Sequence, residues 1–278
     1  MSLSLPVVTD LLTLLELDPI KPDAFVGTGP VLGWGRIYGG QVVAQALRAA
    51  GRTVSGDHRP HSLHAYFVRS GDEHRPVLFE VERVRDGRSF TTRQVVAYQE
   101  GGAILNLIAS FQLMEDDADV QTVQAPVVPG PEALPEIEHD AFLQHREIEH
   151  HGPPHALRRS WLRTLGPMPD DPMIQACALA YLSDEDALGV ALMPHPLAWQ
   201  WDKLMTASLD HAIWFHRPFR ADDWLLFDID GHGVASARGL AFGRVFNRDG
   251  THVASIAQEA LGRTRRSIVP SHDDIDPV

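Results

Sequence analysis

The alternation of apolar and polar residues changes its period along the chain, and each period predicts a different element. Leucines at helical spacing follow Thr9 and Asp10, a capping sequence, and predict a short amphipathic helix that reaches Leu17. A strand is expected at 24–27, and a glycine-rich turn then leads to a helix at 41–50. Alternation with period two predicts four hairpin-linked strands, at 62–69, 77–84, 89–99 and 103–112.

The second half of the chain repeats this order of elements. Residues 159–165 predict a strand, and 173–183 predict a helix rich in Ala and Leu. Four further strands are expected at 209–216, 224–230, 235–246 and 253–261. Local similarities between the halves, such as Ala109 with Ala257, are offset by about 148 residues, which is typical of a duplicated unit.

The order of one long helix followed by hairpin-linked strands favours the α+β class, with an antiparallel sheet curled around a central helix. Such a helix is buried on all sides, and the apolar run 177–182 fits this expectation. Cys177 lies within that run, where a thiol is expected to fill the core rather than to act as a nucleophile. Two such sheets can join edge to edge, which removes one exposed edge from each.

The segment between the halves has the composition of a linker. Acidic residues gather at 115–119, and four prolines follow between 126 and 135. Five histidines then lie at irregular spacing beside a Pro-Pro pair, which favours a solvated linker over a metal site: His139, His145, His150, His151 and His155. We therefore expect one unit at 1–115, a linker at 116–140, a second unit at 141–265 and a tail at 266–278.

Composition and charge exclude several classes of protein. The 278 residues carry 24 Lys and Arg against 37 Asp and Glu, a net charge of −13, which argues against a nucleic-acid partner. A single cysteine and the lack of a long apolar run predict a cytoplasmic protein with no disulfide and no membrane span. The chain has no G-x-S-x-G elbow, Walker A loop, H-E-x-x-H or dinucleotide fingerprint.

Three polar residues stand out because they adjoin or interrupt apolar elements. Asp184 directly follows the predicted buried helix, Ser208 opens a predicted strand, and Gln258 interrupts the apolar face of the last strand. The carboxylate is either a turn residue in water or a base held partly desolvated. Hydroxyls and amides at strand ends commonly bond only to backbone, so these residues taken singly leave both interpretations open.

Seven segments together resemble the acyl-CoA thioesterase II family, the bacterial TesB type and its peroxisomal relatives. They occur in order and at matching spacings between about Leu11 and Arg263. The segments are Tyr38-Gly39-Gly40-Gln41, His61-Ser62-Leu63-His64, Arg85-Asp86-Gly87-Arg88, Tyr181-Leu182-Ser183-Asp184, Ser208-Leu209-Asp210-His211, Ser236-Ala237-Arg238-Gly239 and Ala257-Gln258-Glu259. The resemblance implies a double hotdog fold and hydrolysis of acyl-CoA to a free fatty acid and CoA, without a cofactor.

The resemblance implies that Asp184, Ser208 and Gln258 of the second unit are catalytic. Many family members have Thr where Ser208 stands, and Ala260 replaces a usual Gly. Thioester hydrolysis needs a positioned water, a proton acceptor and donors for the developing oxyanion, for which the backbone N–H groups of a helix N-terminus are suited. Because the set contains no histidine, we expect direct attack by water rather than an acyl-serine intermediate.

Other residues of these segments are candidates for substrate binding. Gly40 and His64 belong to the first half, which is expected to shape the acyl pocket without chemistry of its own. Arg88 and Arg238 are candidates for contacts with the CoA phosphates, since a guanidinium matches phosphate geometry. The Asp-His pair that follows Ser208 is expected mainly to tie loops together.

Two alternative functions remain open. A hotdog hydratase would need a histidine and a carboxylate at the helix start, where Gly40 and Gln41 stand. A protein that binds acyl-CoA without hydrolysing it is the other alternative. The resemblance also implies a homo-oligomer, dimer or tetramer. Because CoA is itself anionic, the net charge requires either local basic residues at the site or acidic residues confined to the linker and tail.

Overall fold

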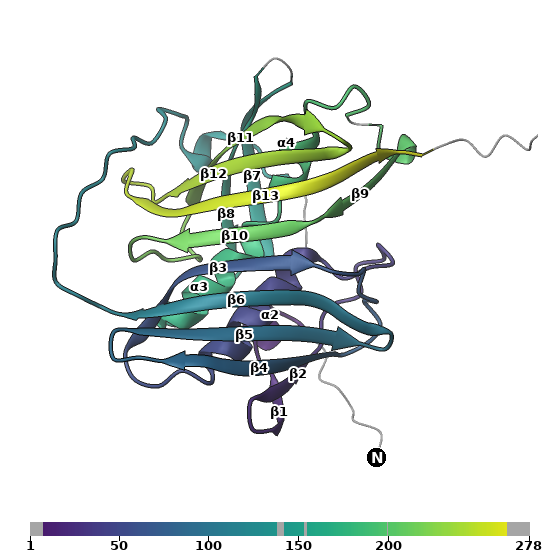
Figure 1. Ribbon diagram of the computed structural model, residues 1–278. Helices are drawn as coiled ribbons and strands as arrows, with labels where there is room; N and C mark the ends of the chain where they lie inside the picture. Colours follow the sequence, from purple (N-terminus) through teal and green to yellow (C-terminus); the bar gives the residue numbers. More distant parts are fainter. Residues whose placement is uncertain (1–7, 138–141, 153–154, 199, 266–278) are drawn as a thin grey trace, which may run out of the picture.

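The strands of the chain form one antiparallel sheet. The computed structural model describes residues 8–137, 142–152, 155–198 and 200–265. Within them, 13 strands have the order β1-β2-β4-β5-β6-β3-β10-β13-β12-β11-β8-β7, and β9 pairs with β13 off this path (Figure 1).

The first half contributes six strands: β1 (Asp18–Lys21), β2 (Ala24–Gly27), β3 (His58–Phe67), β4 (Val77–Asp86), β5 (Phe90–Gln99) and β6 (Gly102–Leu113). The second half contributes seven: β7 (Leu143–His151), β8 (Ala156–Thr164), β9 (Leu204–Ser208), β10 (Asp210–Phe215), β11 (Leu225–Ala235), β12 (Arg238–Phe246) and β13 (His252–Thr264). The helices are α1 (Leu11–Leu14), α2 (Gly39–Gly51), α3 (Pro172–Leu182) and α4 (Ala187–Leu192), with short 3₁₀ turns η1 (Pro131–Ala133) and η2 (Trp201–Lys203).

The two halves have the same topology. The order β2-β4-β5-β6-β3 in the first half matches β8-β11-β12-β13-β10 in the second, with α2 and α3 at equivalent places in the chain. Strand β3 pairs with β10, with Tyr66 opposite Asp210, so the two halves meet at their edges. This confirms the predicted edge-to-edge join and agrees with the duplication inferred from the sequence.

Helices α2 and α3 lie together on one face of the sheet (Figure 1). Every residue of α3 from Ile174 to Leu182 is buried, which confirms the prediction of a helix enclosed on all sides. The helix begins at Pro172. The Asp171 side chain caps it by accepting hydrogen bonds from the backbone N–H groups of Met173 and Ile174. Cys177 is a buried free thiol in this core, and burial raises the pKa of its side chain.

The interpretation of the histidine segment as a solvated linker was wrong for three of its members, whereas His155 is exposed in the turn before β8. His145, His150 and His151 lie on β7, and the His145 side chain is buried beside Asp186. The segment has little apolar character because β7 is the last strand of the sheet, where charged side chains are favoured. His139 lies outside the described residues.

Smaller differences concern short or terminal elements. Ser208 closes β9 instead of opening the following strand, because β10 begins at Asp210. Strands β1 and β9 and helix α4 have no counterpart in the prediction, and α1 ends at Leu14, earlier than expected. Residues 114–130 form neither helix nor strand, and Val123, Ala125 and Val128 pack onto a cluster that contains Trp161. No helix in the described ranges has the length and apolar character that crossing a membrane requires.

Candidate active site

The candidate site lies where the first turn of α2 meets the end of α3. The backbone N–H of Gly40 donates a hydrogen bond of 2.9 Å to Oδ2 of Asp184, the second residue after α3. One turn earlier, the Tyr38 hydroxyl donates to the Tyr181 carbonyl, also at 2.9 Å, and the two rings pack edge to face. These contacts join the two halves of the chain and place a carboxylate at a positive helix end.

The glycines at the start of α2 make this approach possible. A Cβ atom at Gly40 would lie 2.5 Å from the Tyr181 carbonyl oxygen, and one at Gly39 would lie 2.6 Å from Asp184 Oδ2. Any larger residue at Gly40 would meet backbone, which cannot move aside as a flexible side chain can. Gly40, a predicted substrate-binding residue, therefore lies within the site and contacts Asp184 through its main chain.

Ser208 and Gln258 reach the site from neighbouring strands. Gln258 faces inward from β13, and Ser208 closes β9, which pairs with β13 so that Ser208 lies opposite Ala260. The Gln258 amide donates through Nε2 to the Ser208 hydroxyl at 3.0 Å. Burial raises the pKa of Asp184, and the same amide is close enough to oppose that effect in part. The structure thus brings together the three residues that the family resemblance named.

A buried histidine completes the cluster, and sequence reasoning underestimated it. His211 is fully buried; its Nδ1 pairs with Gln258 Oε1, and its Nε2 lies 2.8 Å from the Ser183 hydroxyl. Because the Gln258 amide donates to Ser208, its oxygen accepts from the imidazole, so His211 fixes the orientation of that amide. Both residues occur in the motif segments, Ser183 directly before Asp184 and His211 three residues after Ser208, and that proximity was the available signal.

Burial dominates the electrostatics of the site. The Asp184 side chain is 7% exposed, and its Oδ1 has no hydrogen-bond partner among the described residues. Burial raises the pKa of Asp184, while the nearby His211, the Gln258 amide and the Gly40 N–H act to lower it. Burial also lowers the pKa of His211, which favours a neutral imidazole. Asp184 Oδ1 is therefore a buried acceptor that is free to bind a small polar molecule.

The other candidate binding residues lie elsewhere. His64 is on the outer face of β3, between the inward-facing Leu63 and Ala65, and its Nε2 is 3.2 Å from Asp210 Oδ2. Asp210 also accepts a hydrogen bond from the Glu259 N–H, so this carboxylate ties strands together on the outer face. We predicted that Asp210 and His211 mainly tie loops together. That role fits Asp210, whereas His211 points to the site.

Neither predicted arginine contacts the cluster. Arg238 is on the outer face of β12, where its guanidinium pairs with Glu259, whereas Gln258 faces inward. Arg88 is exposed in the turn between β4 and β5. This turn lies level with the start of β3, whereas Asp210 of β10 pairs with Tyr66 near the other end of β3. The structure therefore does not bring these two cations to Asp184.

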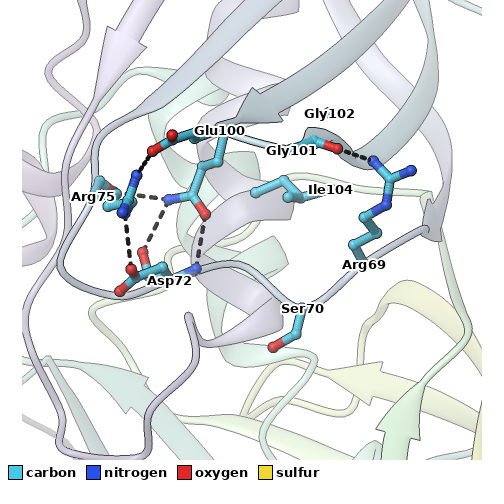
Figure 2. Close-up of a pocket in the computed structure, with 9 residues that line it drawn as sticks. Arg69, Ser70, Asp72, Arg75, Glu100, Gly101, Gly102 and Ile104 are labelled. Carbon is cyan, nitrogen blue, oxygen red and sulfur yellow. Dashed lines mark hydrogen bonds and ion pairs between the residues drawn. The ribbon is translucent and has the colours of Figure 1, made fainter.

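A surface hollow of about 300 Å³ lies apart from the cluster. It is formed by the segment that follows β3 and by the turn between β5 and β6, and Figure 2 shows its polar lining. Both guanidinium groups there are already engaged: Arg75 pairs with Asp72 and Glu100, and Arg69 donates to the Gly101 carbonyl. In the described ranges, no group of three or more His, Cys, Asp or Glu side chains is arranged to hold a metal ion.

The fold is shared with proteins of a known class. A conserved protein with a hot dog fold from Alicyclobacillus acidocaldarius superposes with a TM-score of 0.77 at 19% identity, over 92% of this chain and 98% of that one. The acyl-CoA thioesterase II TesB2 of Mycobacterium marinum has a TM-score of 0.82 at 38% identity, covering 94% of this chain and 99% of that one. The chain thus has the fold of hotdog thioesterases.

Sequence comparison narrows the class to a family. Two family profiles match, "Acyl-CoA thioesterase N-terminal domain" at residues 30–112 and "Acyl-CoA thioesterase" at 133–261. Human acyl-coenzyme A thioesterase 8 is 38% identical over 93% of this chain and 90% of its own length. Acyl-CoA thioesterase 2 of Haemophilus influenzae is 36% identical over 92% of this chain and 98% of its own. The chain belongs to the acyl-CoA thioesterase II family, of the TesB type.

The close approach at Gly40 generates a stability prediction. In Gly40→Ala, the new Cβ collides with the Tyr181 carbonyl and drives α2 away from α3, so the free energy of unfolding should fall by about 1–3 kcal/mol. Gly189→Ala in α4 is the matched control, because its Cβ would meet nothing closer than 4.0 Å and alanine favours a helix. Urea unfolding measures both; equal stability of Gly40→Ala and wild type would contradict the proposed packing.

Proposed function

We propose that this chain is a double hotdog thioesterase that hydrolyses fatty acyl-CoA to a free fatty acid and CoA by direct attack of water. The convergence of Asp184, Ser208 and Gln258 beside the N-terminus of α2 carries the proposal. Relatives at 36–38% identity that are named acyl-CoA thioesterases support the substrate class.

Asp184 is the proton acceptor in this proposal. Its Oδ2 is held by the Gly40 N–H, which leaves the buried Oδ1 to accept a hydrogen bond from the attacking water. A raised pKa strengthens a carboxylate as a base, because proton transfer from water becomes less unfavourable. The Ser208 hydroxyl and the Gln258 amide, joined by their own hydrogen bond, hold the water against the thioester.

The first turn of α2 supplies the electrostatic part. The N–H groups of a helix's first turn lack intrahelical partners, and the aligned peptide dipoles favour negative charge there. The Gly40 N–H already holds Asp184, so we assign the other free N–H groups of the first turn of α2 to stabilise the oxyanion that forms on the thioester carbonyl. The water oxygen bonds to the carbonyl carbon, its proton passes to Asp184, and cleavage of the C–S bond returns that proton to the CoA sulfur.

The unit boundaries follow from the repeated topology. We propose one hotdog unit at 1–115 and a second at 141–265 that carries the catalytic side chains, with the linker at 116–140 between them. The matching strand orders around α2 and α3 support this division. We also propose a homo-oligomer, for which the exposed Tyr66, Trp214 and Phe242 side chains of the sheet offer contact area.

The hydratase alternative is disfavoured by the state of His211. A hydratase needs a histidine that can exchange a proton with substrate, yet both ring nitrogens of His211 are engaged, by Gln258 and Ser183, in a fully buried position. Its role in this geometry is to orient the amide of Gln258. An acyl-CoA binding protein without activity would not need a buried carboxylate, which destabilises the fold unless it serves a purpose.

Replacing the carboxylate separates a thioesterase from a binding protein. Asp184→Asn keeps the shape and can still accept the Gly40 hydrogen bond, but it cannot take a proton, so kcat for hexanoyl-CoA should fall more than about tenfold, or roughly 1.4 kcal/mol. Release of free CoA thiol measures this loss. Asp170→Asn, at a fully exposed carboxylate of the same half, is the control. A wild-type protein that releases no thiol, or a mutant with near wild-type kcat, would show that the assignment is wrong.

The raised pKa of Asp184 predicts the acid limb of the pH profile. The base must be ionised, so kcat/KM should fall as the pH drops through a pKa that lies above about 4, the ordinary range for aspartate. Four groups act on this carboxyl and oppose the effect of burial: His211, Gln258, Gly40 and Arg36. A profile of kcat/KM against pH measures the limb. A limb at or below the ordinary aspartate value would argue against a desolvated base.

A further inference from the structure

The proposed substrate raises an electrostatic problem that the predicted residues do not solve. CoA carries a pyrophosphate and a ribose 3′-phosphate, whereas the chain has a net charge of −13. Arg238 is neutralised by Glu259 on the outer face of the sheet, and Arg88 lies at the opposite end of β3 from the site. A site for the phosphates therefore requires other cations near Ser208.

Two guanidinium groups lie along the unpaired edge of β9. Arg36 donates through Nη1 to the Thr206 carbonyl at 2.9 Å, and Arg265 donates through Nε to the Leu204 carbonyl at 3.1 Å. The backbone N–H of Arg265 donates to the Lys203 carbonyl, which therefore points toward β13. Because carbonyls alternate in direction along a strand, those of residues 204 and 206 point away from β13, to the unpaired edge. Both guanidinium groups thus occupy one edge, at carbonyls about 7 Å apart.

Further positive charge adjoins this edge. Lys203 immediately precedes β9, and Arg263 lies on β13 directly opposite Met205 of β9. Within the part of the chain that the structure describes, none of these four cations makes an ion pair, and the adjacent Asp202 makes none with them. The four are Arg36, Lys203, Arg263 and Arg265, here called the β9 cations. By contrast, Arg238 and Arg244 of β12 face carboxylates. Arg263 shares their outer face of the sheet, beside the exposed Met205, but has no such partner among the described residues.

The β9 cations are at a suitable distance from the chemistry. Strand β9 ends at Ser208. The Thr206 carbonyl, which holds Arg36, lies about 7 Å before Ser208 along the strand, and the Leu204 carbonyl, which holds Arg265, lies about 13 Å before it. Arg36 precedes Tyr38 by two residues, and Tyr38 caps α2 and contacts Tyr181, so this guanidinium belongs to the segment that leads into the site. The extended pantetheine arm of CoA is longer than either separation, so a bent arm would bring the phosphates to the guanidinium groups of this edge.

We propose that the β9 cations bind the phosphates of the CoA moiety, with Arg36 and Arg265 as the principal contacts and the pantetheine arm running along the edge of β9 toward Ser208. This assignment rests on the proposed function. Each guanidinium is fixed by one bond to a backbone carbonyl and keeps further N–H groups for phosphate oxygens. An unpaired cluster of this kind lets an acidic protein attract an anionic substrate at one place.

The test compares two thioesters, one with the whole CoA moiety and one that ends after the cysteamine amide and so lacks every phosphate. Hexanoyl-CoA carries all the phosphates, whereas hexanoyl-N-acetylcysteamine keeps the thioester and has none. For Arg36→Ala and Arg265→Ala, KM for hexanoyl-CoA should rise about tenfold or more, since a charge-assisted contact is lost. On the pH plateau above the acid limb, where Asp184 stays ionised without Arg36, turnover of the N-acetylcysteamine thioester should stay within about twofold of wild type, which also shows that each variant is folded.

Arg59→Ala is the matched control. It removes one exposed positive charge from the start of β3, whereas Tyr66, which pairs with Asp210, lies near the other end of that strand. KM and kcat for both substrates should not change. Raising the salt concentration should increase KM for hexanoyl-CoA in wild type and in the control, and less so in the Arg36→Ala, Arg265→Ala double variant. An unchanged KM in both single variants, or an equal loss on both substrates, would overturn the assignment.

A binding measurement separates this assignment from the proposed function. Adenosine 3′,5′-bisphosphate, the probe, contains the 3′-phosphate and one 5′-phosphate of CoA but no thioester. Calorimetric titration should show that it binds wild type and Arg59→Ala, and that it binds the double variant at least about tenfold more weakly. If wild type hydrolyses neither thioester, the proposed function fails, yet this titration still decides the phosphate site. Equal affinity in wild type and the double variant would refute the site.

Discussion

The hydrogen bond from the Gly40 main chain to Asp184 is the contact on which the site depends. It requires the end of α3 to lie directly against the start of α2, which only glycine permits at that position. The edge pairing of β3 with β10 and the contact between Tyr38 and Tyr181 hold the two helices in this arrangement. The side chains that we propose as catalytic all come from the second half, but the first half supplies the helix end that faces them, a contribution not expected from the sequence.

This arrangement keeps a carboxylate away from water at a cost to stability. Burial of Asp184 is only partly offset by the Gly40 N–H and the Gln258 amide, so the pKa of the carboxyl is raised. His211 and Ser183 stabilise the surrounding network without carrying the charge themselves. A desolvated base beside a positive helix end is an environment in which water can be activated without a metal or a covalent intermediate.

Much of the fold could be predicted from hydrophobic periodicity, whereas the site could be predicted only in part. The paired hairpins and α3 have strong patterns, since one face or the whole element is buried. Strand β7 was missed because its charges pair across the end of the sheet, as Glu147 does with Arg158, and leave no apolar alternation. Which face a residue occupies depends on register. Arg238 and His64 therefore looked like site residues, while the inward direction of His211 was not visible in the sequence.

In the proposed reaction, water and no side chain attacks the thioester. Ser208 and Asp184 are the two groups of the cluster that could form an acyl-enzyme instead, as an ester or an anhydride. Rapid mixing of the protein with excess hexanoyl-CoA, followed by quenching and intact-protein mass measurement, tests this directly. We expect linear release of CoA from the first turnover and no added acyl mass. A burst of CoA stoichiometric with the protein, together with a hexanoyl adduct on Ser208 or Asp184, would contradict it.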